Sequence, residues 1–171
     1  MTESVPAGSG RDLLLAFVDS RPEDGFPDEL TTLAQLRRFQ ADADDADLMP
    51  ARQVRDELAR VLLGPRDIAA AVLGDLGERL RVRPDFRSVG VIGWRVENGG
   101  RLTPLLADLM TAAIELWASG DLEDVHVCEA QSCIVPFVDA SPRRNRHYCS
   151  DTCATRTRVQ RHRRGASSGS S

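Results

Sequence analysis

Four cysteines lie close together in the last third of a chain that has no others. They follow the pattern Cys-x4-Cys, fifteen intervening residues and Cys-x3-Cys, and they are Cys128, Cys133, Cys149 and Cys153. Two close pairs joined by a hairpin-length spacer can direct four sulfurs at one ion, as a tetrahedral zinc site requires. We therefore predict one zinc ion held by all four cysteines. Because four thiolates fill the coordination shell, this zinc should be structural.

Disulfides and an iron–sulfur cluster are the alternatives for these cysteines. The first residues have neither the basic region nor the apolar stretch of a secretion signal, so we expect a cytoplasmic protein with reduced thiols. The Cys-x2-Cys runs of bacterial ferredoxins are missing. His126 and His147 each stand two residues from a cysteine, and either is an alternative ligand if one thiolate is not used. Zinc bound by four thiolates is the leading prediction.

The net charge of −4 hides a strong division along the chain. Residues 143–164 hold eight arginines and one acid, which gives +7, while residues 1–142 hold fourteen arginines and twenty-five acids, which gives −11. Nucleic-acid binding depends on the local field, so this segment predicts a nucleic-acid contact surface. A solvated arginine-rich tail is the alternative. The candidate contact residues are Arg143, Arg144, Arg146, Arg156, Arg158, Arg161, Arg163 and Arg164.

The remaining sequence predicts a separate domain ahead of the cysteines. A chain of 171 residues with 42% hydrophobic residues is long enough for one packed domain and a small module. Helical patterns are interrupted by two short β-like segments without regular alternation, which indicates an α+β fold. The domain should be mostly helical with a small β-sheet, and a treble-clef-like zinc finger should follow it. The expected boundaries are a disordered N-terminus over 1–10, the α+β domain over 11–120, the finger over 121–164 and a flexible tail over 165–171.

Several local signals place the helices of the first domain. Thr32 and Gln35 form a capping-box pair, and Thr103 followed by Pro104 predicts the start of a long apolar helix that ends near Gly120. Residues 13–19 are apolar and short, and their periodicity does not separate a strand from a helix. No apolar run approaches the length that spans a bilayer.

Within the finger, the pattern predicts a hairpin followed by a basic helix. Residues 134–138 should form the first strand and 146–148 the returning one. Ser150 should then cap a helix that runs from Asp151 to about Arg164. The finger has few large apolar side chains, so its folding should depend on the metal.

These residues resemble the CGNR zinc-finger proteins of bacteria. The likeness rests on the Cys-x4-Cys pair, an aromatic strand ending in Asp, a basic loop, an aromatic-Cys-Ser run and a basic helix. The matching residues here are Cys128, Cys133, Phe137, Asp139, Arg143 to Arg146, Tyr148 to Ser150, Cys153 and Arg156 to Arg164. Upstream, Leu15 to Arg21 and Trp94 are similar to the ABATE domain that accompanies such fingers. The resemblance implies a stress-linked transcriptional regulator.

One departure from the family pattern concerns the motif that names it. The sequence reads Cys153-Ala154-Thr155-Arg156, so Gly and Asn are replaced while the thiolate and the arginine remain. Neither replaced residue is a metal ligand, and metal binding should be retained. Any interaction that the Asn of relatives makes with a base or phosphate would be missing here.

The leading functional hypothesis is a DNA-binding transcriptional regulator with an N-terminal sensory or dimerisation domain. The alternatives are a zinc-stabilised protein-interaction module whose basic helix docks on an acidic partner, and an RNA binder that stacks bases on Phe137 and Tyr148. The first domain carries no catalytic constellation, so we do not expect an enzyme. We expect no membrane partner, and a homodimer is a candidate assembly.

Overall fold

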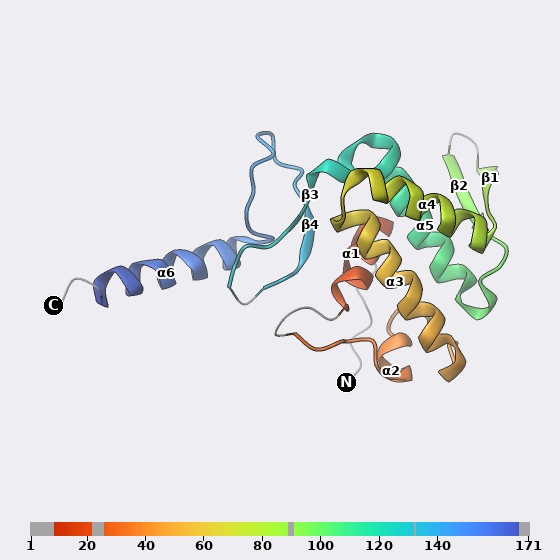
Figure 1. Ribbon diagram of the computed structural model, residues 1–171, viewed down its shortest axis with the longest axis horizontal. Helices are drawn as coiled ribbons and strands as arrows, with labels where there is room; N and C mark the ends of the chain where they lie inside the picture. The colour runs from red at the N-terminus through yellow and green to blue at the C-terminus, as the bar shows by residue number, and fades with distance from the viewer. Residues whose placement is uncertain (1–8, 22–25, 89–90, 132, 168–171) are drawn as a thin grey trace. The chain divides into compact units, whose positions relative to one another are not determined.

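The computed structural model describes residues 9–21, 26–88, 91–131 and 133–167, without the side chains of 87, 88, 91 and 164–167. The chain divides into two compact units, with the boundary between Leu122 and Glu123; we call them unit 1 and unit 2. Helices predominate and two small antiparallel sheets accompany them (Figure 1), which confirms the α+β prediction. No helix in the described ranges is long and apolar enough to cross a membrane.

Unit 1 packs its helices around one apolar core. Helix α5 packs against α1, α3 and strand β2, while α3 also packs against α4. The most deeply buried side chains include Leu14, Phe17, Leu58, Leu62, Leu109 and Leu116. Its elements are α1 (Gly10–Asp19), α2 (Leu33–Leu36), η1 (Asp45–Asp47), α3 (Leu48–Leu63), α4 (Arg66–Leu80), β1 (Val82–Ser88), β2 (Val91–Val96), η2 (Gly100–Leu102), α5 (Thr103–Ser119) and η3 (Asp121–Asp124), the last of which crosses into unit 2.

The apolar segment 13–19 is helical, and a capping box explains why. The backbone N–H of Ser9 donates to the Asp12 carboxylate at 2.9 Å, and the N–H of Asp12 donates to Ser9 Oγ at 3.3 Å. These bonds satisfy two free donors at the start of α1. The helix therefore begins at Gly10, inside the segment expected to be disordered, while residues 1–8 of that segment lie outside the described ranges.

The predicted helix starts are met to different degrees. The capping box of Thr32 and Gln35 is confirmed, but α2 is only four residues long, and Phe39 packs edge-on against Phe17 from beyond it. The helix start at Thr103 and Pro104 is confirmed, but Thr103 does not cap the helix: it is the first residue of α5, and Leu102 stands at the cap position without a side-chain hydrogen bond. The predicted end of the helix is confirmed, because Gly120 follows the last residue of α5 with a positive φ of 79°.

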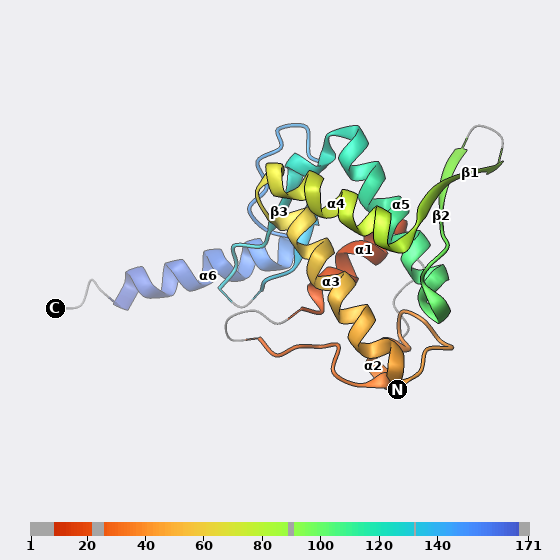
Figure 2. The same cartoon turned by 45° about the vertical axis from the view of Figure 1, so that its right-hand side comes forward.

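A two-stranded hairpin extends from the helices of unit 1 (Figure 2). Strands β1 and β2 pair antiparallel, with Val82 opposite Val96 and Pro84 opposite Trp94. An irregularity between Asp85 and Ser88 shifts the register toward the hairpin end. β1 contacts α4 and β2 contacts α5, so the base of the hairpin packs against both helices.

Helix α4 contains two glycines that its packing does not require. A Cβ built on Gly74 or Gly77 would meet no atom within 4 Å. Neither has a positive φ, so the backbone gives no reason for glycine at either position. A glycine inside a helix costs about 0.5–1 kcal/mol relative to alanine. Both glycines therefore face open space on this side of α4.

Arg55 on α3 is a buried charge with several partners. Its side chain is 1% exposed, and it donates to the two carboxylate oxygens of Asp28 at 2.6 and 3.2 Å. It also donates to the carbonyl of Ser20 at 3.1 Å. Burial disfavours the charged form of Asp28, yet hydrogen bonds from Arg55 and from the Leu30 N–H hold the pKa of that carboxyl below its usual value. The pair fastens Ser20 and Asp28 to α3.

Replacing Asp28 with alanine should destabilise unit 1 by about 1–3 kcal/mol, because the buried Arg55 would lose its two-point partner and keep only the exposed carboxylate of Asp56, 2.9 Å away. The folded-state pKa of Asp28 lies below its unfolded value. Its contribution is therefore present above about pH 4 and is lost as the pH falls through the folded-state pKa. Urea unfolding followed by tryptophan fluorescence at neutral and acidic pH measures both effects.

Arg52→Ala is the matched control for this prediction. Arg52 donates to the same carboxylate at 2.7 Å, but its side chain is 36% exposed, so its removal should cost less than about 1 kcal/mol. Equal costs for the Asp28 and Arg52 variants would show that the buried pair does not anchor this part of unit 1.

Unit 2 contains two short strands and one long helix. Strand β3 (Val125–Val127) pairs antiparallel with β4 (Pro136–Val138), and α6 (Asp151–Ser167) follows after a loop. Ser150 caps α6 as predicted, accepting from the N–H of Cys153 at 3.3 Å. The helix continues to Ser167, a few residues past its expected end. Residues 168–171 of the expected tail lie outside the described ranges.

The predicted partner of the first finger strand is wrong. We expected residues 146–148 to pair with 134–138, but β4 pairs with β3, which precedes the first cysteine. The carboxylate of Asp139 explains the difference. It accepts from the backbone N–H of Ser141 at 2.9 Å and of Arg146 at 2.7 Å. These side-chain hydrogen bonds hold the loop in place of the backbone pairing that we expected between the two strands.

Candidate metal centre and basic helix

The first pair of cysteines is placed by a tight turn after β3. The N–H of Cys128 donates to the carbonyl of Val135 at 3.1 Å, and the N–H of Cys133 donates to the carbonyl of Ala130 at 2.9 Å. These bonds fold the Cys-x4-Cys segment back on itself. Both cysteine side chains consequently approach the same point.

The second pair stands at the beginning of α6. Cys149 comes just before the Ser150 cap, and Cys153 lies in the first turn of the helix. The N–H of Cys149 donates to the Cys128 sulfur at 3.4 Å, which links the two pairs directly. Such a bond stabilises the thiolate form of Cys128, because a deprotonated sulfur is the better hydrogen-bond acceptor.

The four sulfurs converge on one point with the spacing of a zinc site. The Cys149 sulfur lies 3.7 Å from that of Cys133 and 3.7 Å from that of Cys153. All four Sγ atoms lie within 4.8 Å of one another. Four sulfurs placed about 2.3 Å from a tetrahedral zinc stand about 3.8 Å apart. The spacing is also far too long for a disulfide, and all four cysteines are free.

The electrostatics of the cluster call for a cation. Burial and the neighbouring thiols raise the pKa of Cys133 to about 12, and burial also raises the pKa of Cys149, whereas the hydrogen bond with Ser150 lowers the pKa of Cys153. Four adjacent sulfurs therefore do not ionise together without a compensating charge. A zinc ion supplies that charge and displaces the protons. Because it would fill all four positions with protein sulfur, it would hold the fold together and leave no place for a reacting water.

The thiols themselves form much of the apolar core of unit 2. Cys128 and Cys153 are buried together with Ala130 and Phe137. Tyr148 and the other two cysteines pack against this group. So small a cluster contributes little hydrophobic stabilisation, and metal binding is the natural source of the rest.

The two histidines near the cysteines do not belong to the thiol cluster. His147 is exposed, and its Nδ1 lies 2.9 Å from a carboxylate oxygen of Glu129. The ring of His126 lies against Phe137, with 6.0 Å between centroids. The group of possible ligands in the described residues consists of the four cysteines.

Sequence reasoning missed the acids that shape the basic loop. Asp139 is buried; burial opposes its ionisation, but hydrogen bonds from Arg146 and Ser141 lower its pKa. Asp124 is also buried and pairs with Arg144, whose φ is +46°. The bond from the N–H of Ser141 to the Asp139 carboxylate forms an Asx turn, and the Asp-x-Ser sequence was an available signal for it. Nothing in the sequence pointed to Asp124 as the partner of Arg144.

Arg144 and Arg146 make contacts that shape the basic loop of unit 2. Arg144 pairs with Asp124. Arg146 donates to the Cys149 carbonyl at 3.2 Å, and its guanidinium lies 5.8 Å from the centre of the Phe137 ring. These two side chains therefore help to shape the loop, and they are less available to an external partner.

The other candidate arginines lie in the loop or along α6. Those with described side chains are all exposed: Arg143, Arg156, Arg158, Arg161 and Arg163. The side chain of Arg164 lies outside the described part of the chain. Among the described side chains of α6, Cys153 and Thr157 are the buried ones, so the first turns of the helix pack against the rest of unit 2 while its arginines are exposed.

The fold and the thiol geometry of unit 2 define a zinc finger with four cysteines. Its particular type follows from comparison: residues 125–165 match the CGNR zinc finger family, and this segment contains all four cysteines and most of α6. The match covers 41 of the 171 residues. No curated protein matches the chain. The similarity of residues 11–120 to an ABATE domain stays a prediction.

Purified protein should contain one zinc ion per chain, and Cys133→Ser should lose it, because three thiolates and a hydroxyl bind zinc far more weakly than four thiolates. Metal analysis of the two proteins measures this directly. His147→Asn is the control and should keep its zinc. A folded protein without zinc, or one that contains iron and absorbs in the visible range, would contradict the assignment.

Proposed function

We propose that this protein is a DNA-binding transcriptional regulator of the cytoplasm. In this proposal the zinc finger presents α6 to DNA, and unit 1 senses a signal or forms a dimer. The observation that carries the proposal is the position of the last metal ligand, Cys153, in the first turn of an arginine-rich helix. A metal at the thiol cluster would fix the direction of α6, and a fixed helix loses less freedom on binding than a disordered tail.

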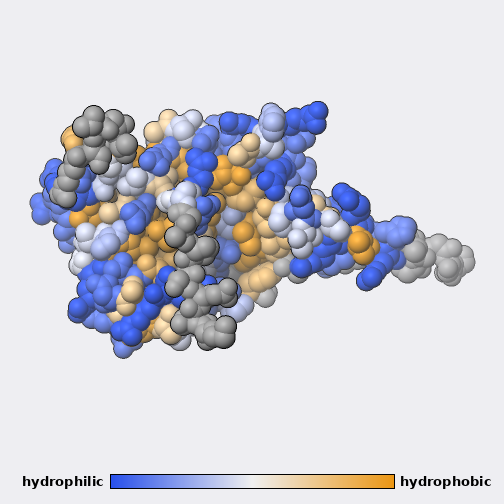
Figure 3. Space-filling view, turned by 180° about the vertical axis from the view of Figure 1, so that it is seen from behind, coloured by the Kyte–Doolittle hydropathy of each residue, from blue (hydrophilic) through white to orange (hydrophobic). Residues whose placement is uncertain are grey.

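The surface of α6 supports contact with a polyanion. The helix has seventeen residues, so it is about 25 Å long, comparable to a DNA groove contact. Its visible surface is predominantly hydrophilic (Figure 3). Arg158 and Arg161 are exposed, and no partner occurs for them among the described residues. Arginine offers a planar set of donors that suits phosphate oxygens and guanine edges.

RNA recognition by stacking is less well supported. Phe137 is 7% exposed and belongs to the core of unit 2, and Tyr148 packs against the same cluster. Their rings are therefore used inside the finger, whereas single-stranded RNA needs aromatic faces open to the bases. This observation favours DNA.

The remaining parts of the proposal are less specific. A closed thiolate shell offers no position for a substrate, so we propose that the zinc finger is not a catalytic site. A link to stress responses rests on the family resemblance alone. Docking of α6 on an acidic protein is the competing outcome of the binding experiment.

Neutralising Arg158 and Arg161 together with glutamine should weaken binding to every DNA sequence. The slope of log affinity against log salt should fall by about 0.9 for each phosphate that the protein no longer neutralises. Fluorescence anisotropy with labelled duplexes over a salt series measures both quantities. The matched control is Arg38→Gln with Arg60→Gln, which removes the same charge from exposed positions of unit 1 and should leave the slope unchanged.

Replacing Arg156 should act differently, because it lies near the start of α6, where recognition helices often meet base edges. Arg156→Gln should cost about 1–3 kcal/mol on a preferred duplex selected from a random pool and little on other sequences. If zinc-loaded protein binds no duplex even at about 50 mM salt, where electrostatic binding is strong, the DNA proposal fails and the protein-interaction hypothesis replaces it.

A further inference from the structure

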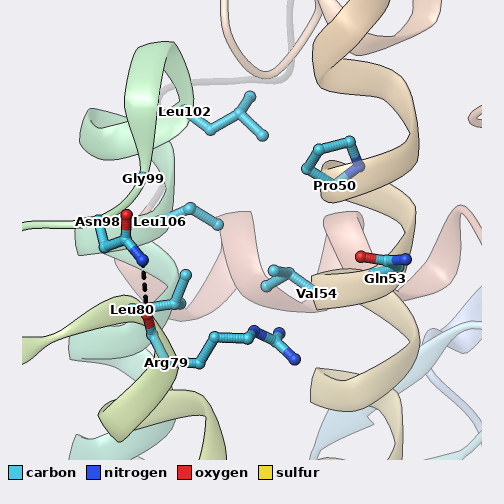
Figure 4. Close-up of a pocket in the computed structure, with 9 residues that line it drawn as sticks. All are labelled: Pro50, Gln53, Val54, Arg79, Leu80, Asn98, Gly99, Leu102 and Leu106. Carbon is cyan, nitrogen blue, oxygen red and sulfur yellow. Dashed lines mark hydrogen bonds between the residues drawn. The ribbon is translucent and has the colours of Figure 1, made fainter.

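One hollow formed by described residues of unit 1 is edged by polar groups that already have partners. It measures about 200 Å³ and lies between α3 and the start of α5. Figure 4 shows Asn98 donating to the Arg79 backbone at its edge, over 2.9 Å. The guanidinium of Arg79 pairs with Glu57. Its polar groups therefore serve the fold and leave little to recognise a ligand.

A larger hollow lies where the base of the β1–β2 hairpin meets α4 and α5. It measures about 330 Å³, within the size range of small-molecule sites. In the described part of the chain none of its lining side chains is charged. Trp94 from β2 and Trp117 from α5 line it, together with Met110 and Ile114. Two indoles, a thioether and aliphatic groups make a surface suited to an aromatic ring.

Two glycines of α4 form part of the wall of this hollow. Gly74 and Gly77 line it, and a Cβ at either would meet no atom within 4 Å, so no packing neighbour within the described chain explains them. Alanine at either position would favour the helix. Two residues that are unfavourable in a helix face the same open volume. We take this to mean that glycine stands at these positions to leave the volume open.

We propose that this hollow binds a small, uncharged, flat aromatic molecule. Its volume of about 330 Å³ suits a compound of two or three rings, and the described lining offers no charged group to pair with an ionic ligand. The proposal gives the proposed regulator a class of signal and in that sense rests on the proposed function. Its test contains no DNA, so either proposal can fail while the other holds.

The two tryptophans make the site directly observable. They are the only ones in the sequence, and both line the hollow. Titration of the full-length zinc-loaded protein with N-phenylnaphthylamine, an uncharged aromatic probe, should quench tryptophan emission saturably with one site per chain. Anilinonaphthalene sulfonate, which adds a negative charge to a similar ring system, should bind about tenfold more weakly or worse.

Filling the hollow separates a binding role from a structural one. Gly74→Leu should weaken binding of the uncharged probe about tenfold or more, while the melting temperature of the variant stays at or above that of the unaltered protein, because leucine favours a helix over glycine. Gly77→Leu should do the same and serves as a second variant. The control Asp75→Ala changes an exposed, non-lining residue of the same helix and should bind the probe normally.

Three results would overturn the proposal. The first is no saturable quenching in a folded protein, and the second is equal affinity of Gly74→Leu and the unaltered chain. The third is a dimer, seen by sedimentation at the assay concentration, that Gly74→Leu dissociates. This last result would assign the face to a second copy of the chain.

Discussion

Convergence of four thiols on one point is the constraint on which unit 2 depends. Each local feature of the finger places one or two sulfurs: the turn after β3 places Cys128 and Cys133, and the Ser150 cap places Cys153. Little else holds this unit together, since its buried apolar side chains are few. The same metal that would compensate the thiolates would therefore supply much of the folding free energy, on the order of 10 kcal/mol for structural zinc.

The two units thus rely on different sources of stability. Unit 1 has an extensive core of leucines around α5, together with a buried ion pair between Arg55 and Asp28. Unit 2 replaces such a core with a cation site. On this account the order of α6 and its arginines would depend on metal, while the hollow between α4, α5 and the hairpin lies in unit 1, which has its own apolar core. Metal and ligand would then act on separate parts of the protein.

Sequence reasoning succeeded where a few adjacent residues determine the outcome. The spacing of the cysteines predicted their cluster, the Thr32–Gln35 pair predicted its capping box, and Ser150 was recognised as the cap of α6. Each of these depends on contacts within a few residues or on the strict geometry of metal ligands.

Other features depend on contacts that are distant in sequence and could not be predicted. The strand partner of 134–138 was missed because Asp139 closes the loop through its side chain, which frees β4 to pair with β3. Arg55 resembles any arginine on an amphipathic helix until Asp28 folds against it. Gly74 and Gly77 lie inside a helix, where glycine is unfavourable, and only the fold shows the open volume before them. For Arg55 and the two glycines the deciding feature lies beyond the local sequence, whereas the Asp139 turn had a local signal in its Asp-x-Ser sequence.

The central claim is that a metal bound by the four thiols orders unit 2 and with it the basic helix. Amide hydrogen exchange of the full-length protein, measured before and after removal of zinc with a chelator, tests it most directly. The account predicts that protection is lost across β3, β4 and α6 and kept in α1, α3 and α5. Protection of α6 and the β3–β4 pair that is unchanged after complete zinc removal would contradict it.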